Sequence, residues 1–235
     1  STQSRSSAAS DVYKRQEVNR IFSGEADEAL LEKYAPVLES LKTGRELAKI
    51  LEQRSRDKGA VDFESGESMF TLDENGVCID VRPRVQGEAE KMIEQLMITA
   101  NQAAAKLAKE EQLPFVYRIH ENPDPERIKA LVSLAAALGF STQRLRSEKP
   151  SPADFSELLG QVRGTPAEQV ISHQVLRTME KAKYSTEPVG HFGLALADYC
   201  HFTSPIRRYP DLAIHRILSL SLIHISEPTR PERIS

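Results

Sequence analysis

Hydroxyl and guanidinium side chains are concentrated in one short segment near the C-terminal end of the chain. The segment reads Thr203-Ser-Pro-Ile-Arg-Arg-Tyr-Pro210. Ser204 followed by Pro205 is typical of a helix start, because a hydroxyl caps free backbone N–H groups and proline needs no N–H there. Arg207 and Arg208 would then fall in the first turn, where the helix dipole disfavours cations unless an anion also binds. These groups together predict a phosphate site.

The same residue types have a plainer interpretation. Arg207 and Arg208 could form surface salt bridges, and Thr203 with Ser204 could be a simple helix cap. The segment alone does not choose between the two. In either case Pro210 is expected to end the turn and to begin the next helix.

That next helix carries Asp211 and His215, whose spacing of four residues is that of a two-ligand metal site. No third ligand follows at a fitting spacing, so a polar face or a carboxylate that orients a buried histidine is the commoner arrangement. Cys200 and His201 could suggest a nucleophile and its base, but adjacent residues on a strand point to opposite faces. We therefore predict no metal ligand and no cysteine nucleophile here.

A second candidate is the strand expected at residues 115–119, which combines aromatic and cationic side chains with His120. Such a strand could present a stacking platform for single-stranded nucleic acid. The alternation also fits a strand whose Phe115, Tyr117 and Ile119 face inward, with Arg118 and His120 in solvent. Both interpretations remain open from the sequence.

Periodicity and capping signals predict the elements that position these residues. Apolar residues at helical spacing, with Pro36 and the glycines as breaks, predict helices at 27–34, 37–56, 88–112, 124–138, 153–159 and 166–183. Alternation around Asp73-Glu-Asn-Gly76 predicts a hairpin of residues 68–73 and 77–81. The fold class is therefore α/β in the mixed α+β sense, helix-rich with a β-hairpin and short strands.

Composition and charge limit the classes of function. The net charge of −3 gives no overall attraction to nucleic acid, so RNA contacts must come from a local basic cluster. Cys78 and Cys200 lack finger spacing, which argues against structural zinc and suits a reduced, cytoplasmic protein. No apolar run reaches the roughly 18 residues of a membrane helix. Residues 1–16 and 221–235 lack a period and resemble foreign or disordered tails around a domain at 17–220.

Longer motifs make the chain similar to a known family. His191-Phe-Gly-Leu-Ala-Leu196, Tyr199 through Leu212 and His215-Arg216 resemble the signature of the ribonuclease R / ribonuclease II (RNB) catalytic domain. Supporting stretches lie upstream, at 60–63, 94–101 and 116–125. The resemblance spans about Glu17 to Leu220 and leans toward ribonuclease R.

This resemblance implies a 3′-to-5′ exoribonuclease that releases nucleoside 5′-monophosphates from single-stranded RNA with Mg²⁺. The family's metal-binding aspartates match no stretch here, so they are expected upstream of a fragment that is inactive alone. Arg207 would be the catalytic residue that binds the scissile or adjacent phosphate. The resemblance implies RNA contacts for these further residues: Arg208, Thr203, Ser204, Tyr117, His120, Asn101 and Glu94.

Tyr117 or Phe115 would stack on a base of the RNA. No membrane and no obligate protein partner are implied. Two other classes remain open: a non-catalytic RNA-binding module, and a metabolic enzyme that shares only the phosphate-binding turn. The metal-binding aspartates would separate the first class from the exoribonuclease, and the shape of the cavity beside the turn would separate the second.

Overall fold

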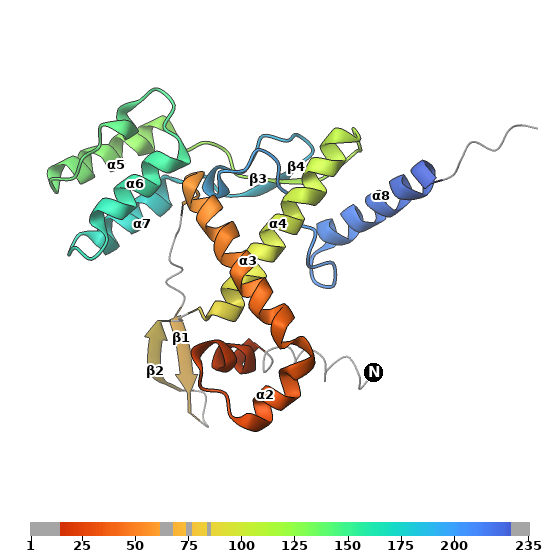
Figure 1. Ribbon diagram of the computed structural model, residues 1–235. Helices are drawn as coiled ribbons and strands as arrows, with labels where there is room; N and C mark the ends of the chain where they lie inside the picture. Colours follow the sequence, from red (N-terminus) through yellow and green to blue (C-terminus); the bar gives the residue numbers. More distant parts are fainter. Residues whose placement is uncertain (1–14, 62–67, 74–76, 84–85, 227–235) are drawn as a thin grey trace, which may run out of the picture. The chain divides into compact units, whose positions relative to one another are not determined.

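The computed structural model describes residues 15–61, 68–73, 77–83 and 86–226, and its elements are labelled in Figure 1. The chain divides into two compact units. The first comprises Ser1–Arg54 with Phe63–Leu96, and the second comprises Ser55–Asp62 with Met97–Ser235. Helices α3 (Leu38–Asp57) and α4 (Glu88–Glu110) each contribute residues to both units.

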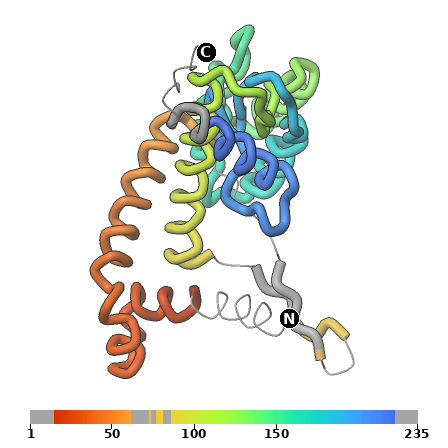
Figure 2. The backbone as a smooth tube through the Cα atoms, turned by 90° about the vertical axis from the view of Figure 1, so that its right-hand side faces the viewer, coloured from red at the N-terminus to blue at the C-terminus, as the bar shows by residue number. Residues whose placement is uncertain are grey.

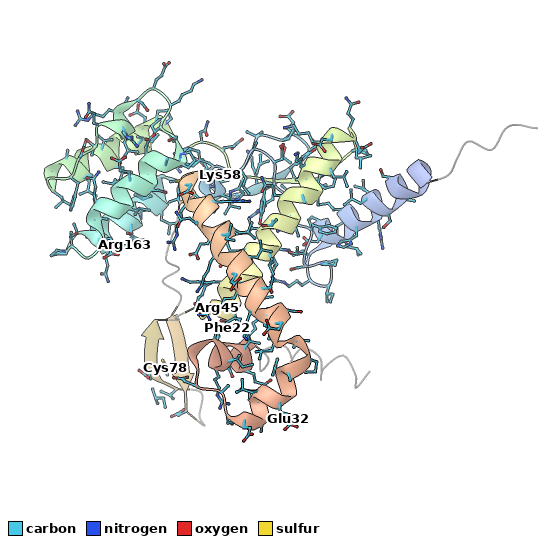
Figure 3. All side chains as sticks on the ribbon, in the orientation of Figure 1. Phe22, Glu32, Arg45, Lys58, Cys78 and Arg163 are labelled. Atoms are coloured by element: carbon cyan, nitrogen blue, oxygen red, sulfur yellow. The ribbon has the colours of Figure 1, made fainter. Side chains whose placement is uncertain are left out.

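The first unit contains a helix at residues 15–23, α2 (Glu28–Tyr34), the short η1 (Ala35–Val37) and most of α3. Asp27 caps α2 by accepting a hydrogen bond from the Leu30 N–H at 2.9 Å. Asn19 caps α4 by accepting from the Ala89 N–H at 2.8 Å. Arg45 pairs with Glu88 and lies over the ring of Phe22, with 4.9 Å between guanidinium carbon and ring centroid (Figure 3). The expected pair of helices on either side of Pro36 is confirmed.

The expected hairpin also belongs to the first unit. Strands β1 (Ser68–Leu72) and β2 (Cys78–Pro83) pair antiparallel, with an irregularity between Thr71 and Leu72. The predicted Asn-Gly turn at 74–76 lies outside the described residues. The hairpin prediction is confirmed for its two strands.

The second unit holds the other elements of the fold. Strands β3 (Tyr117–Ile119) and β4 (Lys183–Ser185) form a two-stranded antiparallel sheet. Helices α5 (Pro125–Ala137), α6 (Pro152–Val162) and α7 (Glu168–Thr178) lie together in Figure 1. The short η2 (Arg144–Arg146) contacts α5 and α6. The short η3 (Phe192–Leu194) and α8 (Tyr209–Ser226) complete the unit.

One hydrophobic cluster ties the sheet to two helices of the second unit. Its members come from α4, from β3 and the residues before it, from the loop before α8, and from α8 itself: Ala104, Ala105, Ala108, Phe115, Tyr117, Ile119, Cys200 and Ile214. The path of α8 and the C-terminal half of α4 can be followed in Figure 2. Because these segments share one core, the loop that leads into α8 is anchored to α4 and β3.

Two expectations about the elements are wrong. The helix expected at 166–183 covers only Glu168–Thr178, because Lys183–Ser185 pair with β3 instead. No α-helix starts at Ser204: residues 205–207 form a single turn, and α8 begins at Tyr209. Helical residues begin at 15, and α8 continues past Leu220 to Ser226. The mixed, helix-rich fold class is confirmed.

Candidate nucleic-acid interface

The candidate interface is built on the turn that precedes α8. The carbonyl of Ser204 accepts hydrogen bonds from the N–H groups of Arg207 at 3.3 Å and Arg208 at 3.1 Å. Pro205 favours such a turn because its ring fixes φ near the required value. The chain reverses here before Pro210 enters α8, so two arginines and two hydroxyls lie within one turn of each other.

Asp211, near the start of α8, bonds to both ends of the turn at Ser204–Arg208. Its Oδ2 accepts from the Ser204 N–H at 2.8 Å and from Arg208 Nε and Nη2 at 3.1 and 3.0 Å. Asp211 is fully buried, whereas 23% of the Arg208 side chain is exposed. A carboxylate in the first turn is also stabilised by the helix dipole. Asp211 therefore locks the turn, and Arg208 is held against it.

Asn101 braces the same loop from α4. It is only 2% exposed, and its Oδ1 accepts from the N–H groups of Phe202 at 2.9 Å and Thr203 at 3.2 Å. Its Nδ2 donates to the Tyr199 hydroxyl at 3.1 Å. A buried amide that satisfies two loop N–H groups fixes backbone geometry, because leaving such groups unpaired is costly. Asn101 thus acts on the loop and does not project into solvent.

His215 supports the loop one helical turn after Asp211. Its Nε2 donates to the Phe202 carbonyl at 2.9 Å, and its ring stacks on Phe202 with centroids 4.1 Å apart and 13° between planes. A carbonyl only accepts hydrogen bonds, so Nε2 carries the proton. Asp211 and His215 therefore bind different parts of the loop, and Asp211 does not orient the histidine.

These braces leave Arg207 as the exposed cation of the turn. No ion pair or hydrogen bond of its side chain occurs among residues 15–61, 68–73, 77–83 and 86–226. Thr203 Oγ1 is buried without a hydrogen-bond partner in the described chain, as is Asp211 Oδ1. The structure thus brings Thr203, Ser204, Arg207 and Arg208 together, and it adds Asn101 as their support.

Two residues expected to contact RNA lie in the interior. Tyr117 is 5% exposed, and its ring packs edge-on against Phe115 at 5.2 Å between centroids. His120 is also buried: its Nε2 lies 2.7 Å from the Glu180 carbonyl, and its Nδ1 accepts from the Gly193 N–H at 3.0 Å. Stacking of Tyr117 or Phe115 on a base does not fit this burial. The inward-facing alternative for this strand holds for Phe115, Tyr117 and Ile119.

Glu94 lies seven residues before Asn101 on α4, but in the part of the helix that belongs to the first unit. Its side chain is exposed. The loop at residues 202–208, which Asn101, Asp211 and His215 hold, is called the braced loop. Glu94 is not among the residues that hold it.

The sequence analysis missed an aromatic ring on the outer face of the small sheet. Tyr184 lies opposite Arg118 in the β3–β4 register, and the Arg118 guanidinium carbon is 4.9 Å from its ring centroid. The Tyr184 hydroxyl is 2.9 Å from His201 Nδ1. Alternation along 117–119 places Arg118 outward, but only knowledge of the distant partner strand could have revealed Tyr184.

Histidines beside this face are held in the neutral state. Burial, and then the nearby His120 and Arg118, lower the pKa of His191 to about 3. Burial, followed by the charges of Arg208 and Arg118, lowers the pKa of His201 to about 4. Both rings are therefore uncharged near neutrality, and the positive charge of this region comes from its arginines.

Stability should consequently fall on acidification below pH 6.5. A histidine with a depressed folded-state pKa binds fewer protons when folded, so its stabilisation is complete above the unfolded pKa and is lost as pH decreases. Between pH 6.5 and 4.5 the chain should lose about 2 kcal/mol more unfolding free energy than the His191→Gln variant. Urea unfolding at several pH values measures this difference. His173→Gln, at an exposed position on α7, is the control, and equal pH slopes for wild type and His191→Gln would contradict the assignment.

The described residues do not fit a resident metal ion. No group of three or more His, Cys, Asp or Glu side chains that could hold one occurs in the parts of the chain that the structure describes. Asp211 Oδ2 is occupied by Arg208 and Ser204, and His215 is committed to Phe202. No described helix is long and apolar enough to cross a membrane.

A model of the RNB domain matches residues 9–224, which include every residue of the braced loop. The chain belongs to the RNB-domain family. The resemblance that the sequence motifs predicted is therefore confirmed.

Curated relatives of this RNB chain are similar over most of its length. Ribonuclease R of Thermotoga maritima is 42% identical over 220 residues, covering 90% of this chain and 31% of the relative. Ribonuclease R 1 of Lactococcus lactis is 41% identical over 201 residues, covering 86% of this chain and 24% of the relative. The chain thus spans about a quarter to a third of the length of these relatives.

Solved structures agree with the RNB assignment. Mycoplasma genitalium RNase R in complex with ribose methylated single-stranded RNA superimposes with a TM-score of 0.81 at 28% identity, over 93% of this chain and 34% of that one. Yeast Ssd1, a pseudonuclease, shares the fold at a TM-score of 0.59 and 18% identity over 85% of this chain and 26% of that one. The fold is therefore shared with a protein that is described as a pseudonuclease.

Proposed function

We propose that this chain is part of a 3′-to-5′ exoribonuclease that hydrolyses single-stranded RNA to nucleoside 5′-monophosphates. The observation that carries the proposal is the closed turn Ser204–Arg208. Asp211 neutralises Arg208 and holds the turn, while Arg207 is left exposed and unpaired within the described chain. A single free guanidinium on a rigid turn suits a phosphate of the RNA backbone.

The residues of the turn have different roles in this proposal. Arg207 binds the phosphate at or next to the scissile bond, where charge increases in the transition state. Arg208 and Asn101 are positioning residues, because their polar groups are directed to Asp211 and to the loop backbone. The Ser204 N–H is already bonded to Asp211, so it is the hydroxyl of Ser204 that remains for RNA. Tyr117 and His120 lie too deep in the fold for a direct contact.

Divalent metal chemistry is implied by the family, and a bound Mg²⁺ would supply activation of water and stabilisation of the leaving oxygen. We assign no ligand for it to the described residues, since they contain no group of three possible ligands and Asp211 Oδ2 is bonded to Arg208 and Ser204. The role of this chain in catalysis is to bind and orient the RNA phosphate.

The isolated chain should bind single-stranded RNA but not hydrolyse it in the presence of Mg²⁺. Binding is measured by fluorescence anisotropy over a salt series, and hydrolysis by release of nucleoside monophosphates. The log–log salt slope should decrease by about 0.7 in Arg207→Ala, because one phosphate contact on a single strand contributes about that much. Arg163→Ala, an exposed arginine after α6 (Figure 3), should keep the wild-type slope.

Three outcomes would change the proposal. Mg²⁺-dependent release of mononucleotides by the pure chain would show that the catalytic groups lie within it. If the full-length protein binds RNA through Arg207 but releases no product, the non-catalytic RNA-binding module is correct. If no RNA binds at all, the exoribonuclease assignment fails for this chain.

A further inference from the structure

The outer face of the β3–β4 sheet carries an aromatic ring beside unpaired positive charge. Arg118 and Tyr184 form a cross-strand pair, and the Arg118 N–H donates to the Tyr199 carbonyl at 2.9 Å. Tyr117 and Ile119 on either side point into the core. The pair therefore faces outward from a rigid base.

Tyr184 is held in place and is still accessible. Its hydroxyl is fixed by His201 at 2.9 Å, and the imidazole meets its ring edge-on at 76°. The Arg118 guanidinium covers one face of the ring, yet Tyr184 remains 41% exposed. An aromatic ring whose torsions are already fixed loses little conformational entropy when a flat ligand stacks on it.

Two arginines near Tyr184 have no acidic ion-pair partner in the described part of the chain. Among the described residues no acidic side chain forms an ion pair with Arg118 or with Arg207. Besides burial, Arg118 and Arg207 both lower the pKa of His201, whereas Asp211 raises it. His201 leads directly into the braced loop, since Phe202 and Thr203 follow it in the chain. The ring and the phosphate-binding turn are thus connected by one short, fixed segment.

We propose that Tyr184, backed by Arg118, is a stacking platform for one nucleobase of the RNA strand whose backbone phosphate lies at Arg207. This inference rests on the proposed function and names a base contact that the phosphate turn alone lacks. Stacking accepts any base, because every base has a π face, and purines should stack more strongly than pyrimidines. The Arg118 guanidinium is attracted to the π electrons of the Tyr184 ring. Because it is positively charged, it also attracts nearby phosphates of the RNA.

The test measures affinity of the full 235-residue chain for a short single-stranded oligoribonucleotide. Tyr184→Ala should weaken binding roughly five- to 150-fold, the range for loss of one base–aromatic stack. Tyr184→Phe keeps the ring and Tyr184→Trp enlarges it, so both should stay within about threefold of wild type. Tyr34→Ala, in the first unit, is the tyrosine control, and circular dichroism of each variant verifies folding.

Oligonucleotides with a single abasic position separate stacking from mere support of the sheet. At one position along the strand, removal of the base should weaken wild-type binding but have no effect on Tyr184→Ala. If the loss in Tyr184→Ala is the same for every abasic oligonucleotide, the ring only stabilises the sheet and the platform is wrong. If Arg207→Ala weakens binding but Tyr184→Ala does not, the platform fails while the proposed function stands. If neither variant changes binding, both fail.

Discussion

Replacement of Arg207 by alanine in the full-length enzyme is expected to slow single-turnover cleavage about a hundred- to a thousand-fold. Loss of one comparable donor to a developing oxyanion costs roughly 2.7–4 kcal/mol in the transition state. Arg207 is the guanidinium that the turn exposes, since Arg208 is held by Asp211. RNA affinity should fall much less, because many other phosphates of the strand remain bound and only transition-state contacts affect the chemical step.

Arg207→Lys distinguishes charge from geometry. An ammonium keeps the charge but cannot make the planar, two-pronged contact, so the lysine variant should not regain the full rate. Arg163→Ala provides a matched loss of one exposed arginine and should cleave like wild type. If affinity falls and the single-turnover rate is unchanged, Arg207 only tethers the RNA and is not catalytic.

Removal of the Arg208 charge should have the largest effect on stability. Arg208→Met leaves the fully buried Asp211 with only the Ser204 N–H as a partner. Breaking a buried ion pair typically costs about 3–5 kcal/mol, and we expect about 3 kcal/mol because the Arg208 side chain is 23% exposed. Urea unfolding followed by circular dichroism measures the change in unfolding free energy.

The double variant Arg208→Met with Asp211→Asn is the control for this effect. It removes both charges, and the carbonyl oxygen of the new amide could still accept from the Ser204 N–H, so most of the lost stability should return. Lys129→Ala removes an exposed pair with Glu126 and should leave the free energy of unfolding nearly unchanged, because water screens exposed ion pairs. If Arg208→Met matches the Lys129→Ala control, the buried pair does not stabilise the fold.

Local signals in the sequence predicted most of the helices. The apolar period and a proline indicated the helices around Pro36, and the structure has them at Glu28–Tyr34 and Leu38–Asp57. Asp124 before Pro125 predicted the start of α5, and Asp124 does cap it through the Glu126 N–H. These features depend on residues close in the sequence, so the sequence is sufficient to find them.

One of the two errors comes from pairing between distant residues. Lys183–Ser185 carry helix-compatible residues next to α7, but their backbone groups are satisfied by β3. The Ser204-Pro205 signal does produce a turn, but the turn does not continue as a helix, because Pro210 has no N–H to donate to it. At Lys183–Ser185, tertiary contacts override a local preference that is worth only a few tenths of a kcal/mol.

The sequence predicted only part of the candidate site, because it identifies residues that are close along the chain but not their distant partners. Arg207, Arg208, Thr203 and Ser204 share one segment, so their proximity follows from the sequence. Burial of Tyr117 and His120 depends on which face of β3 meets the core, and the sequence left that alternative open. The exposed ring of Tyr184 required the partner strand to be known.

The hydrogen bonds of Asn101 affect when the site forms during folding. Its bonds to Tyr199, Phe202 and Thr203 join residues separated by 98, 101 and 102 positions. Closing a loop of that length costs conformational entropy before any contact compensates for it, so such contacts form late. A peptide of residues 199–216 would contain the whole arginine motif, together with Asp211 and His215, but it would lack the amide that shapes the backbone at 202–203. The segment alone is therefore not expected to adopt this backbone, and the turn at Ser204–Arg208 should form only after α4 and α8 have come together.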